Sequence, residues 1–389
     1  MSIHGKKIII VGAGIGGLTA ALALRARGAE VVVLEQANAI TEVGAGLQIS
    51  PNGSVVLGAL GLGDTLAQAS VRAKAVVLRD YRRAGEVLRL DLMRYAPDQS
   101  FWFVHRADLI DLLADAVRDA GVQVLLSRQV ISVKGGVHPT VKLADGSEMS
   151  ADLVVGADGL HSKVRLALGA VEPGFFTGQV AWRAVVPNDL GLVNEAQLFM
   201  APGRHLVCYP LRDGTMVNLV AVQERAQWAD EDWAHGADPA NLRAAFADFT
   251  GTAEALLAQV DQVKLWGLFR HPVAECWQGP GLAILGDAAH PTLPFLAQGA
   301  NLAMEDAWVL AQCFETGLSM AEGLAAYQAK RRDRAARVIG VANGNARKYH
   351  LRFPPLRAAA HMALRLGGAL APARMVRQFD WLYRYDVTK

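Results

Sequence analysis

The sequence has few cysteines and no long apolar run, and both shortages narrow the classes of protein it can encode. Its only cysteines are Cys208, Cys276 and Cys313, among 389 residues. An odd number at wide spacing argues against a disulfide framework and against a zinc site, so we expect no metal. No apolar run is long enough to span a bilayer. Lys6 and Lys7 lead directly into a strand rather than into a signal peptide, and we expect a cytoplasmic protein.

Net charge is also small, and it is unevenly distributed. The formal charge of the whole chain is +2, which gives no indication of a nucleic-acid partner. Residues 331–389, however, carry 13 lysines and arginines against three aspartates. This basic C-terminal tail either contacts a membrane surface or forms helices that pack on the protein with their arginines in solvent. We expect the second arrangement and keep the first as the alternative.

The length and the hydrophobic pattern indicate two lobes. A chain of 389 residues is long for one compact core, and 52% of its residues are hydrophobic. Residues 7–11 and 30–34 are continuous apolar runs, which are typical of strands buried on both faces of a parallel sheet. Between them, residues 18–27 are rich in alanine and leucine and predict a helix. The chain therefore begins with a strand–helix–strand unit.

Later segments divide between this sheet and a second one. Residues 152–156 and 282–286 are short apolar strands, whereas residues 179–222 hold several short runs separated by turns, which is typical of an antiparallel sheet. Residues 75–92 are also strand-like and are expected to join the second sheet. The predicted fold class is α/β, with a Rossmann-like parallel sheet, an inserted, mainly antiparallel substrate domain and a helical C-terminus. The predicted segments are 1–72, 102–172 and 276–330 for the dinucleotide-binding domain, 73–101 and 173–275 for the substrate-domain sheet, and 331–389 for the helical tail.

A glycine-rich turn, Gly-x-Gly-x-x-Gly, connects the first strand to the first helix. Gly12 permits the tight turn, Gly14 lets backbone approach a pyrophosphate, and Gly17 lets the helix lie close to the sheet. The free N–H groups at the start of the helix favour phosphate. The turn therefore predicts a dinucleotide site formed by Gly12, Gly14, Ile15, Gly16 and Gly17.

Acidic residues follow three of the predicted parallel strands. Glu35 ends the second strand, where a carboxylate accepts hydrogen bonds from ribose hydroxyls and repels a 2′-phosphate. Asp158 and Asp287 follow the two later strands, in the segments GADG and GDAAHP. At that edge of the sheet an aspartate can bind a ribityl hydroxyl. Because FAD is long enough to use several strand ends and an NAD dehydrogenase does not need this set, the sequence favours FAD.

These motifs resemble those of the class A flavoprotein aromatic hydroxylases, the family that contains p-hydroxybenzoate and salicylate hydroxylases. Three segments carry the resemblance in the family's order: the glycine-rich turn with Glu35, GADGLHSKVR and GDAAHPTLP. Further similar segments are GAGLQISPN, HRADL, AQGANLAMEDA and the terminal WLYRYD. The resemblance covers essentially the whole chain, and it implies a glutathione-reductase-like FAD-binding domain.

The resemblance also implies roles for individual residues toward the cofactor. Asp287 would hold the ribityl chain, Arg106 would contact the FAD phosphates, and backbone near Val130 would contact the adenine. Asp158, with Arg165 nearby, would support both the pyrophosphate and the docking of NAD(P)H. The last FAD-domain helix would direct its positive N-terminus at the flavin pyrimidine edge and stabilise the reduced flavin. The remaining cofactor contacts implied are Gly46, Gly299, Ala300 and Asn301.

The resemblance further implies the reaction. NADH or NADPH would reduce FAD, O₂ would add at flavin C4a, and the resulting hydroperoxide would hydroxylate a small aromatic ring of the phenol or hydroxypyridine type. No second glycine-rich nucleotide turn is present, which agrees with a family that lacks a separate NAD(P)H domain.

Candidate substrate residues lie in the predicted second sheet. His205 and Tyr209 are four residues apart, so they share one face of a strand, where a base would help because a phenolate is a better nucleophile than a phenol. His205 as a turn residue and Tyr209 as a core residue is the alternative. Arg183 either binds a carboxylate, serves NAD(P)H or flavin movement, or lies on the surface. The expected pocket-lining residues are Leu47, Gln48, Met200, Pro294 and Phe295, with Phe295 as an aromatic wall.

Two other functions share parts of this pattern. A flavin oxidase or dehydrogenase acting on a non-aromatic substrate would have Gly12 to Glu35 but no reason for the GADG segment. A non-catalytic binder with this fold would not need Glu35, Asp158 and Asp287 together. The sequence leaves open the substrate, the choice between NADH and NADPH, and whether the protein is a monomer or a homodimer.

Overall fold

The first lobe is built on a mostly parallel sheet. The computed structural model describes residues 3–40, 45–169, 171–225, 236–315 and 317–389. In spatial order the six strands of this sheet are β19 (Gln278–Gly279), β20 (Leu282–Ile284), β12 (Leu153–Gly156), β1 (Lys7–Val11), β2 (Glu30–Leu34) and β8 (Gln123–Leu125). All pair in parallel except β19, which is antiparallel to β20. The apolar runs form these strands because both of their faces are covered, and Ile10 and Val155 are wholly buried.

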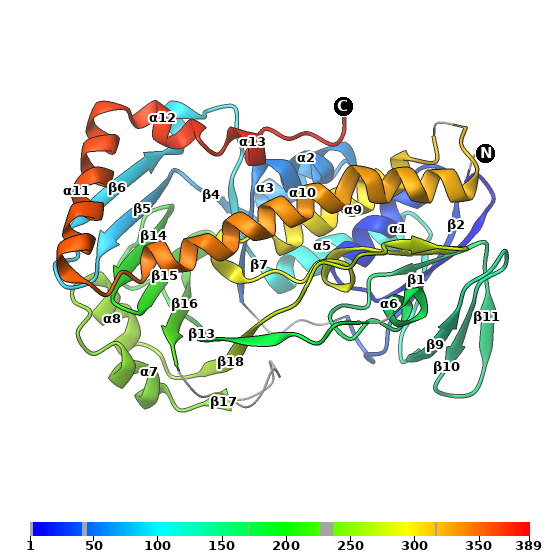
Figure 1. Ribbon diagram of the computed structural model, residues 1–389, viewed down its shortest axis with the longest axis horizontal. Helices are drawn as coiled ribbons and strands as arrows, with labels where there is room; N and C mark the ends of the chain where they lie inside the picture. Colours follow the sequence, from blue (N-terminus) through cyan, green and yellow to red (C-terminus); the bar gives the residue numbers. More distant parts are fainter. Residues whose placement is uncertain (1–2, 41–44, 170, 226–235, 316) are drawn as a thin grey trace.

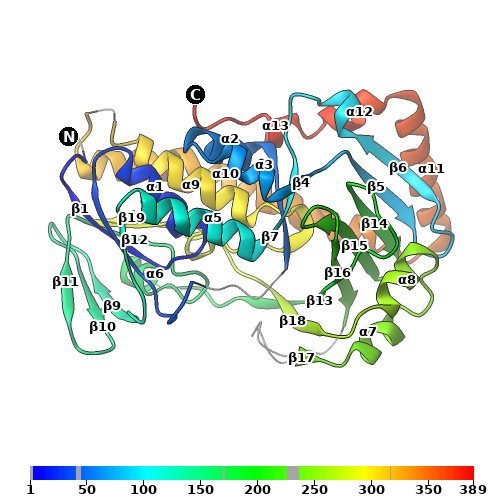
Figure 2. The same cartoon turned by 180° about the vertical axis from the view of Figure 1, so that it is seen from behind.

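Helices and two small sheets complete the first lobe. Three helices, α1 (Ile15–Arg25), α5 (Arg106–Asp119) and α9 (Gly299–Gln312), pack side by side, with α1 in the middle (Figure 2). One small sheet has the order β3 (Gly46–Ile49), β7 (Trp102–His105), β4 (Ser70–Arg72), and the other β11 (Glu148–Ser150), β10 (Thr140–Leu143), β9 (Val130–Lys134). Shorter elements of this lobe are α2 (Pro51–Ala59), α3 (Gly63–Gln68), α6 (Lys163–Leu168) and the 3-10 turns η1 (Gly286–Ala288) and η2 (Pro294–Leu296).

The second lobe is an eight-stranded sheet at the other end of the molecule (Figure 1). Its order is β17 (Gly236–Ala237), β18 (Val263–Arg270), β13 (Phe175–Pro187), β16 (Met216–Glu224), β15 (Arg204–Leu211), β14 (Glu195–Ala201), β5 (Ala75–Asp80), β6 (Glu86–Asp91). Every described pairing is antiparallel except β14 with β5. The strand-like residues 75–92 therefore join this sheet as predicted. Its outer face packs on Phe246 and Leu256, from the region of α7 (Pro239–Ala245) and α8 (Thr252–Ala258).

The fold-class prediction is confirmed, and the C-terminal part of the chain is helical. Its helices are α10 (Met320–Tyr349), α11 (Pro354–Leu370), α12 (Pro372–Arg377) and α13 (Asp380–Tyr383), and a short α4 (Leu92–Tyr95) lies in contact with α12. Helix α10 is 30 residues long and runs from the first lobe to the second, so it crosses the segment boundary placed after residue 330 (Figure 1). Within the described ranges, no helix combines the length and the apolar composition needed to cross a bilayer.

Arg331 of α10 is buried and Arg334 is largely buried, so for these two residues the expectation that the arginines of the tail lie in solvent is corrected. Arg331 is fully buried and donates from Nε to Asp306 Oδ1 at 2.7 Å and from Nη1 to Glu305 Oε2 at 2.6 Å. Arg334 donates to the same Glu305 from Nε at 2.7 Å. Burial alone would raise the pKa of Asp306, but the charges of His290 and Arg331 lower it to about 2. This pairing joins α10 to α9 and stabilises the fold at any pH above about 4, a contribution lost as the pH falls toward 2.

We expect Arg331→Met to be strongly destabilising, because it leaves two buried carboxylates without their shared cation. Breaking a buried ion pair in this way costs about 3–5 kcal/mol of unfolding free energy. Arg347→Met is the matched control, since Arg347 lies on the same helix and is exposed. Chemical denaturation followed by circular dichroism measures both variants. Equal stability of the two would contradict the structural role assigned to Arg331.

Candidate functional site

The predicted cofactor residues lie at the carboxyl ends of neighbouring parallel strands. Val11 pairs with Gly156, and Gly156 pairs with Ile284, so the segments that follow β1, β12 and β20 leave the sheet at one edge. These segments carry Gly12 and Gly14, then Asp158, then Asp287. Glu35 follows β2 at the same edge. Ligands of open α/β sheets bind at this edge, and the sequence prediction that these segments converge is borne out.

The glycine-rich turn is packed tightly everywhere except at Gly14. A Cβ added at Gly12, where φ is +102°, would lie 2.5 Å from the Ala157 carbonyl oxygen, and one added at Gly17 would overlap the Gly12 carbonyl oxygen. Gly17 is thus required by the turn itself rather than only by the distance from helix to sheet. Gly16 would meet the side chain of Leu285 at 2.7 Å. At Gly14 an added Cβ meets nothing within 4 Å, which leaves open space beside the first residues of α1.

The helix that begins at this turn offers its own N–H groups. Gly14 is the N-cap residue of α1, and it provides no side-chain cap. The Ile15 side chain is buried in the core, so only its backbone can contact a ligand. Uncapped N–H groups and a positive helix end next to open space fit a pyrophosphate.

Both carboxylate oxygens of Glu35 accept hydrogen bonds from backbone N–H groups. Its Oε2 accepts from Ala13 N at 2.8 Å and its Oε1 accepts from Ala37 N at 2.9 Å, which holds the carboxylate against the glycine-rich turn. A cavity of about 390 Å³ lies beside it, lined by Gln36, Ser127, Arg128, Gln129, Leu143, Ala144 and Asp145. Val130 follows Gln129, and its side chain is buried, so its backbone is the part available to an adenine.

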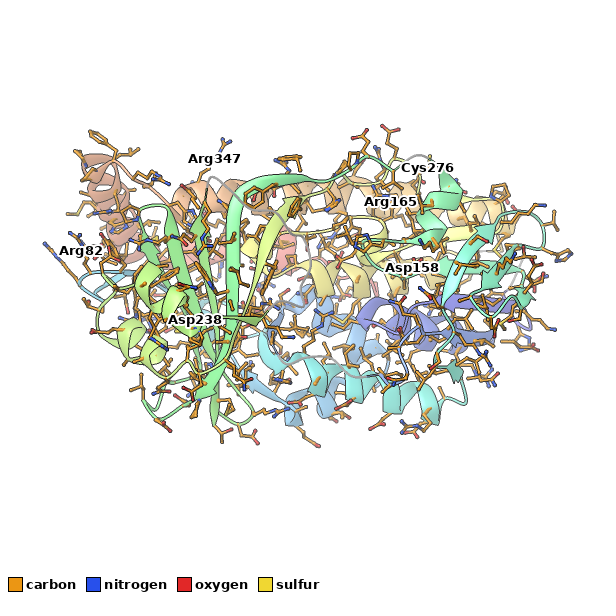
Figure 3. All side chains as sticks on the ribbon, turned by 90° about the horizontal axis from the view of Figure 1, so that it is seen from below. Arg82, Asp158, Arg165, Asp238, Cys276 and Arg347 are labelled. Carbon is orange, nitrogen blue, oxygen red and sulfur yellow. The ribbon has the colours of Figure 1, made fainter. Side chains whose placement is uncertain are left out.

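Asp158 has an unused acceptor next to the glycine-rich turn. Its Oδ2 accepts from Lys163 N at 2.7 Å, while its buried Oδ1 has no hydrogen-bond partner among the residues that the structure describes. Burial raises the pKa of this carboxyl, although nearby donors such as Ser162 oppose the shift. Asp158 and Arg165 lie in the same half of the molecule, far from Arg82 at the other end of its long axis (Figure 3).

Arg165 is buried, so it does not present an exposed docking surface for NAD(P)H. It donates from Nη2 to Pro272 O at 3.2 Å and from Nη1 to Ala288 O at 3.5 Å. Arg165 therefore connects the segment after β12 to the segment after β20, and this contact fixes the spacing of Asp158 and Asp287.

Asp287 is exposed to solvent, but protein surrounds its carboxyl group. The resulting loss of hydration raises the pKa of that carboxyl, and the electrostatic effects of His290, Arg106 and His271 oppose the shift. Arg106 begins α5 and is close enough to Asp287 to act on it electrostatically. The structure thus brings together two residues that are 181 positions apart and that the sequence assigned to one cofactor.

The N-terminus of α9 lies against the end of β3. Helix α9 begins at Gly299 and Ala300 without a side-chain cap from Gln298. The Asn301 side chain accepts from Ser50 N at 3.0 Å and donates to Gln48 O at 3.0 Å, so it fixes the end of β3 against α9. Only the backbone of Asn301 remains for a cofactor.

Gly46 seats β3 against the second lobe. Its N–H donates to Asn218 Oδ1 at 2.7 Å, and an added Cβ would lie 2.7 Å from the Tyr209 ring. Asn218 was not identified from the sequence, where nothing marks it as a partner of a residue 172 positions away. Gly44, the first residue of the same motif, lies outside the described residues.

His205, Tyr209 and Arg183 share the inner face of the large sheet, as their register shows. His205 pairs with Val222, Tyr209 with Asn218 and Arg183 with Val220, and cross-strand partners point to the same side. Their ring neighbours differ. His205 lies 5.9 Å from Phe295, Tyr209 lies 4.9 Å from Phe103, and the Arg183 guanidinium lies 5.4 Å from Trp266, measured to ring centroids.

The environment of His205 and Tyr209 keeps both side chains neutral near pH 7. Burial lowers the pKa of His205 well below 6.5, and the neighbouring His350 lowers it further. Burial raises the pKa of Tyr209 above 10, which the charge of Arg183 only partly offsets. A neutral imidazole can accept a proton, whereas a neutral phenol can donate a hydrogen bond.

The other expected pocket residues come from three elements, β3, η2 and β14. Phe295, in η2 with Pro294, packs against Val220 and Val222 of the inner face. Leu47 and Gln48 are half-buried on β3. Met200, the cross-strand partner of His205, shares the inner face and packs with Val87 and Leu198 near Tyr349, whose ring lies 5.5 Å from the His205 ring. No group of residues suited to hold a metal ion occurs in the described parts of the chain.

The chain is similar to known proteins over most of its length. Residues 6–342 match the family described as FAD binding domain. The chain is 34% identical to 3-amino-4-hydroxybenzoate 2-monooxygenase of Streptomyces cremeus, over 89% of this chain and 88% of the relative. It is 33% identical to a salicylate hydroxylase of Pseudomonas putida, over 98% and 93%. A crystal structure of Klebsiella pneumoniae HpxO, in a variant form complexed with FAD, superposes with a TM-score of 0.85 at 27% identity, over 97% and 98% of the chains.

Two single-methyl substitutions separate ligand binding from folding at the glycine-rich turn. Gly14→Ala enters open space, so we expect unfolding free energy to change by less than about 0.5 kcal/mol while bound FAD is largely lost, because the methyl group occupies the space for the pyrophosphate. Gly17→Ala overlaps the Gly12 carbonyl and should destabilise the apoprotein itself. Flavin absorbance after gel filtration and the thermal midpoint of the apoprotein measure the two effects. A Gly14→Ala protein that retains full flavin would refute the site.

Proposed function

The chain belongs to the family of proteins with this FAD binding domain, and on that premise we propose that it is an FAD-dependent monooxygenase that hydroxylates a small phenolic or hydroxypyridine acid with NAD(P)H and O₂. Its relatives include a 3-amino-4-hydroxybenzoate 2-monooxygenase and a salicylate hydroxylase. The observation that carries the proposal is the row of strand ends that brings Gly14, Asp158 and Asp287 to one edge. Phe295, eight residues after Asp287, packs on the inner face of the second sheet.

The residues at this edge fit FAD in order along its length. The cavity beside Glu35 and the backbone at Val130 would hold the adenosine, and the N–H groups at Gly14 and Ile15 would hold the pyrophosphate. The unused Oδ1 of Asp158 and the accessible carboxylate of Asp287 would accept hydrogen bonds from hydroxyl groups. When bound, FAD supplies electron transfer from NAD(P)H and the activation of O₂.

The second lobe would hold and prepare the substrate. The buried, neutral His205 would accept the phenolic proton, and the Tyr209 hydroxyl would donate a hydrogen bond to the resulting oxygen. Arg183 would pair with a carboxylate of the substrate. Phe295, which packs on Val220 and Val222, would exclude water from the face of the substrate ring.

A substrate screen tests this function. Purified protein carrying FAD is incubated with NADH or NADPH, ¹⁸O₂ and a panel of hydroxybenzoates and hydroxypyridine carboxylates. We expect at least one compound to accelerate oxidation of the reduced nicotinamide and to gain one ¹⁸O atom by mass spectrometry. Reduction of the flavin by an amine or a hydroxy acid without NAD(P)H would instead identify an oxidase or dehydrogenase and overturn the proposal.

Asp287→Ala tests the predicted ribityl contact. Loss of one hydrogen bond to a charged acceptor should weaken FAD binding by about 1.5–3 kcal/mol, or roughly tenfold to a hundredfold. Asp189→Ala is the control, because Asp189 is an exposed aspartate of the second lobe. Fluorescence titration of the apoprotein with FAD gives both affinities, and unchanged binding in Asp287→Ala would remove this residue from the site.

We also propose that the outer face of α11 contacts an anionic membrane surface. The inner side of α11 packs on β6, at the end of the molecule far from β9 to β11 (Figure 1). Its outer side leaves large apolar residues in solvent, with Leu370 82% and Leu366 52% exposed. The chain has no acidic residue from 334 to 379, and Arg365 is exposed on the same helix. An apolar stripe bordered by arginines fits a helix that lies on a surface of acidic lipids, whereas a second copy would bring like charges together.

Vesicle flotation tests this surface. Wild-type protein should float with phosphatidylglycerol vesicles at low salt and should dissociate from them at high salt. It should not float with phosphatidylcholine vesicles. Leu366→Glu with Leu370→Glu should abolish flotation without changing flavin content. If the wild type ignores acidic vesicles, or if the double variant only converts a dimer into a monomer, α11 is not a membrane contact.

A further inference from the structure

Three buried or partly buried side chains connect the inner face of the large sheet to solvent. His205 Nδ1 lies 2.7 Å from His350 Nε2, and His350 Nδ1 lies 2.9 Å from Glu224 Oε1. His205 and His350 are each 3% exposed, whereas the Glu224 side chain is 30% exposed. His205, His350 and Glu224 thus form a hydrogen-bonded row that begins beside Phe295 and ends in solvent.

Each member of the row is held by a different element. His205 is on β15, Glu224 ends β16, and His350 follows the last residue of α10. Gly203 completes the arrangement, because its φ of +65° turns the hairpin and its N–H donates to the His350 carbonyl at 3.2 Å. Positions so far apart in sequence do not meet by local folding, so the row is a product of the tertiary structure.

The groups that face the two imidazoles are few. His205 is faced by Phe295, by Tyr349 and by His350. His350 is faced by His205 and Glu224, and the charge of Arg352 also acts on it. Arg352 donates from Nε to Glu224 Oε2 at 3.1 Å, and it holds that carboxylate in its ionised form.

An ionised Glu224 fixes the direction of every hydrogen bond in the row. A carboxylate only accepts, so His350 must carry its proton on Nδ1 and leave Nε2 as an acceptor. His205 must then carry its proton on Nδ1 and leave its own Nε2 as an acceptor. Hence the last free lone pair of the row belongs to His205, the histidine on the inner face.

We infer that His350 and Glu224 are positioning residues that form a proton relay with His205, which carries the phenolic proton of the substrate between the inner face of the sheet and solvent. This inference rests on the proposed function for the identity of the substrate, and on geometry alone for the direction of the relay.

The transfer balances atom by atom. The substrate O–H bond breaks and an N–H bond forms at His205 Nε2. The Nδ1 proton of His205 passes to His350 Nε2, and the Nδ1 proton of His350 passes to Glu224 Oε1. Glu224 then releases its proton to water, so the substrate becomes a phenolate with no buried cation left behind. The reverse transfers return a proton to the product and reset both imidazoles.

The first test needs no substrate. ¹⁵N–¹H correlation spectra of the imidazoles in the resting FAD-loaded protein report which nitrogen carries the proton. We expect both His205 and His350 to be neutral, with protons on Nδ1, assigned by His205→Gln and His350→Gln spectra. A proton on Nε2 of His205, or a cationic His350, would overturn the relay whatever the protein hydroxylates.

The second test uses Glu224→Gln, whose amide keeps the shape of the carboxylate but cannot take up a proton. With the phenol that the screen identifies, we expect kcat at neutral pH to fall roughly tenfold to a hundredfold while KM stays within about twofold. The defect should shrink as the pH rises and the phenol ionises in solution, and Glu224→Asp should restore part of the rate.

Glu195→Gln is the matched control, because Glu195 is a buried carboxylate of the same sheet that pairs with Arg89 outside the row. We expect it to leave kcat within about twofold at every pH. A Glu224→Gln defect of the same size at all pH values, or no defect, would contradict proton transfer through Glu224. If no phenol is hydroxylated at all, the proposed function fails, and the imidazole spectra still decide the direction of the relay.

Discussion

The buried pairing of Arg331 with Glu305 and Asp306 is the constraint on which the rest of the structure depends. All three side chains are fully buried, and a charge in the protein interior is stable only when its partners are held in place. Arg331 belongs to α10, which runs along the molecule, and its two acidic partners belong to α9. The position of α9 is thereby set relative to both lobes.

The same two carboxylates also reach the cofactor edge. Asp306 accepts from Gly286 N at 3.1 Å and bonds to His290, so it holds both sides of the turn that carries Asp287. Glu305 accepts from Asn52 Nδ2 at 2.6 Å, which fixes the start of α2. A single ionic cluster therefore fixes α9, the turn after β20 and the start of α2 relative to one another.

The local parts of this account were predictable from sequence, because they depend on short-range rules. Gly12, Gly14 and Glu35 are recognisable from a strand, a turn and a helix within about thirty residues. The shared face of His205 and Tyr209 follows from the two-residue period of a strand. Asp158 and Asp287 could be placed at one edge because each follows a buried strand.

The parts that were missed or misplaced depend on long-range packing. Arg331 looks like one more arginine of a basic tail until α9 is seen to present two carboxylates to it. His350 lies 145 positions from His205, and no local pattern marks it as a partner. Met200 pairs with His205, as the alternation along its strand allows, but its contacts with Val87 of β6 and Tyr349 of α10 follow from no local pattern.

The central claim is that three strand ends form one FAD site facing the inner sheet. A crystal structure of the flavin-loaded protein tests it most directly. The account predicts the pyrophosphate at the Gly14 and Ile15 N–H groups, the ribityl chain beside Asp287 and the flavin ring between the start of α9 and the face that carries His205. A flavin bound elsewhere, or one whose ring lies away from that face, would contradict it.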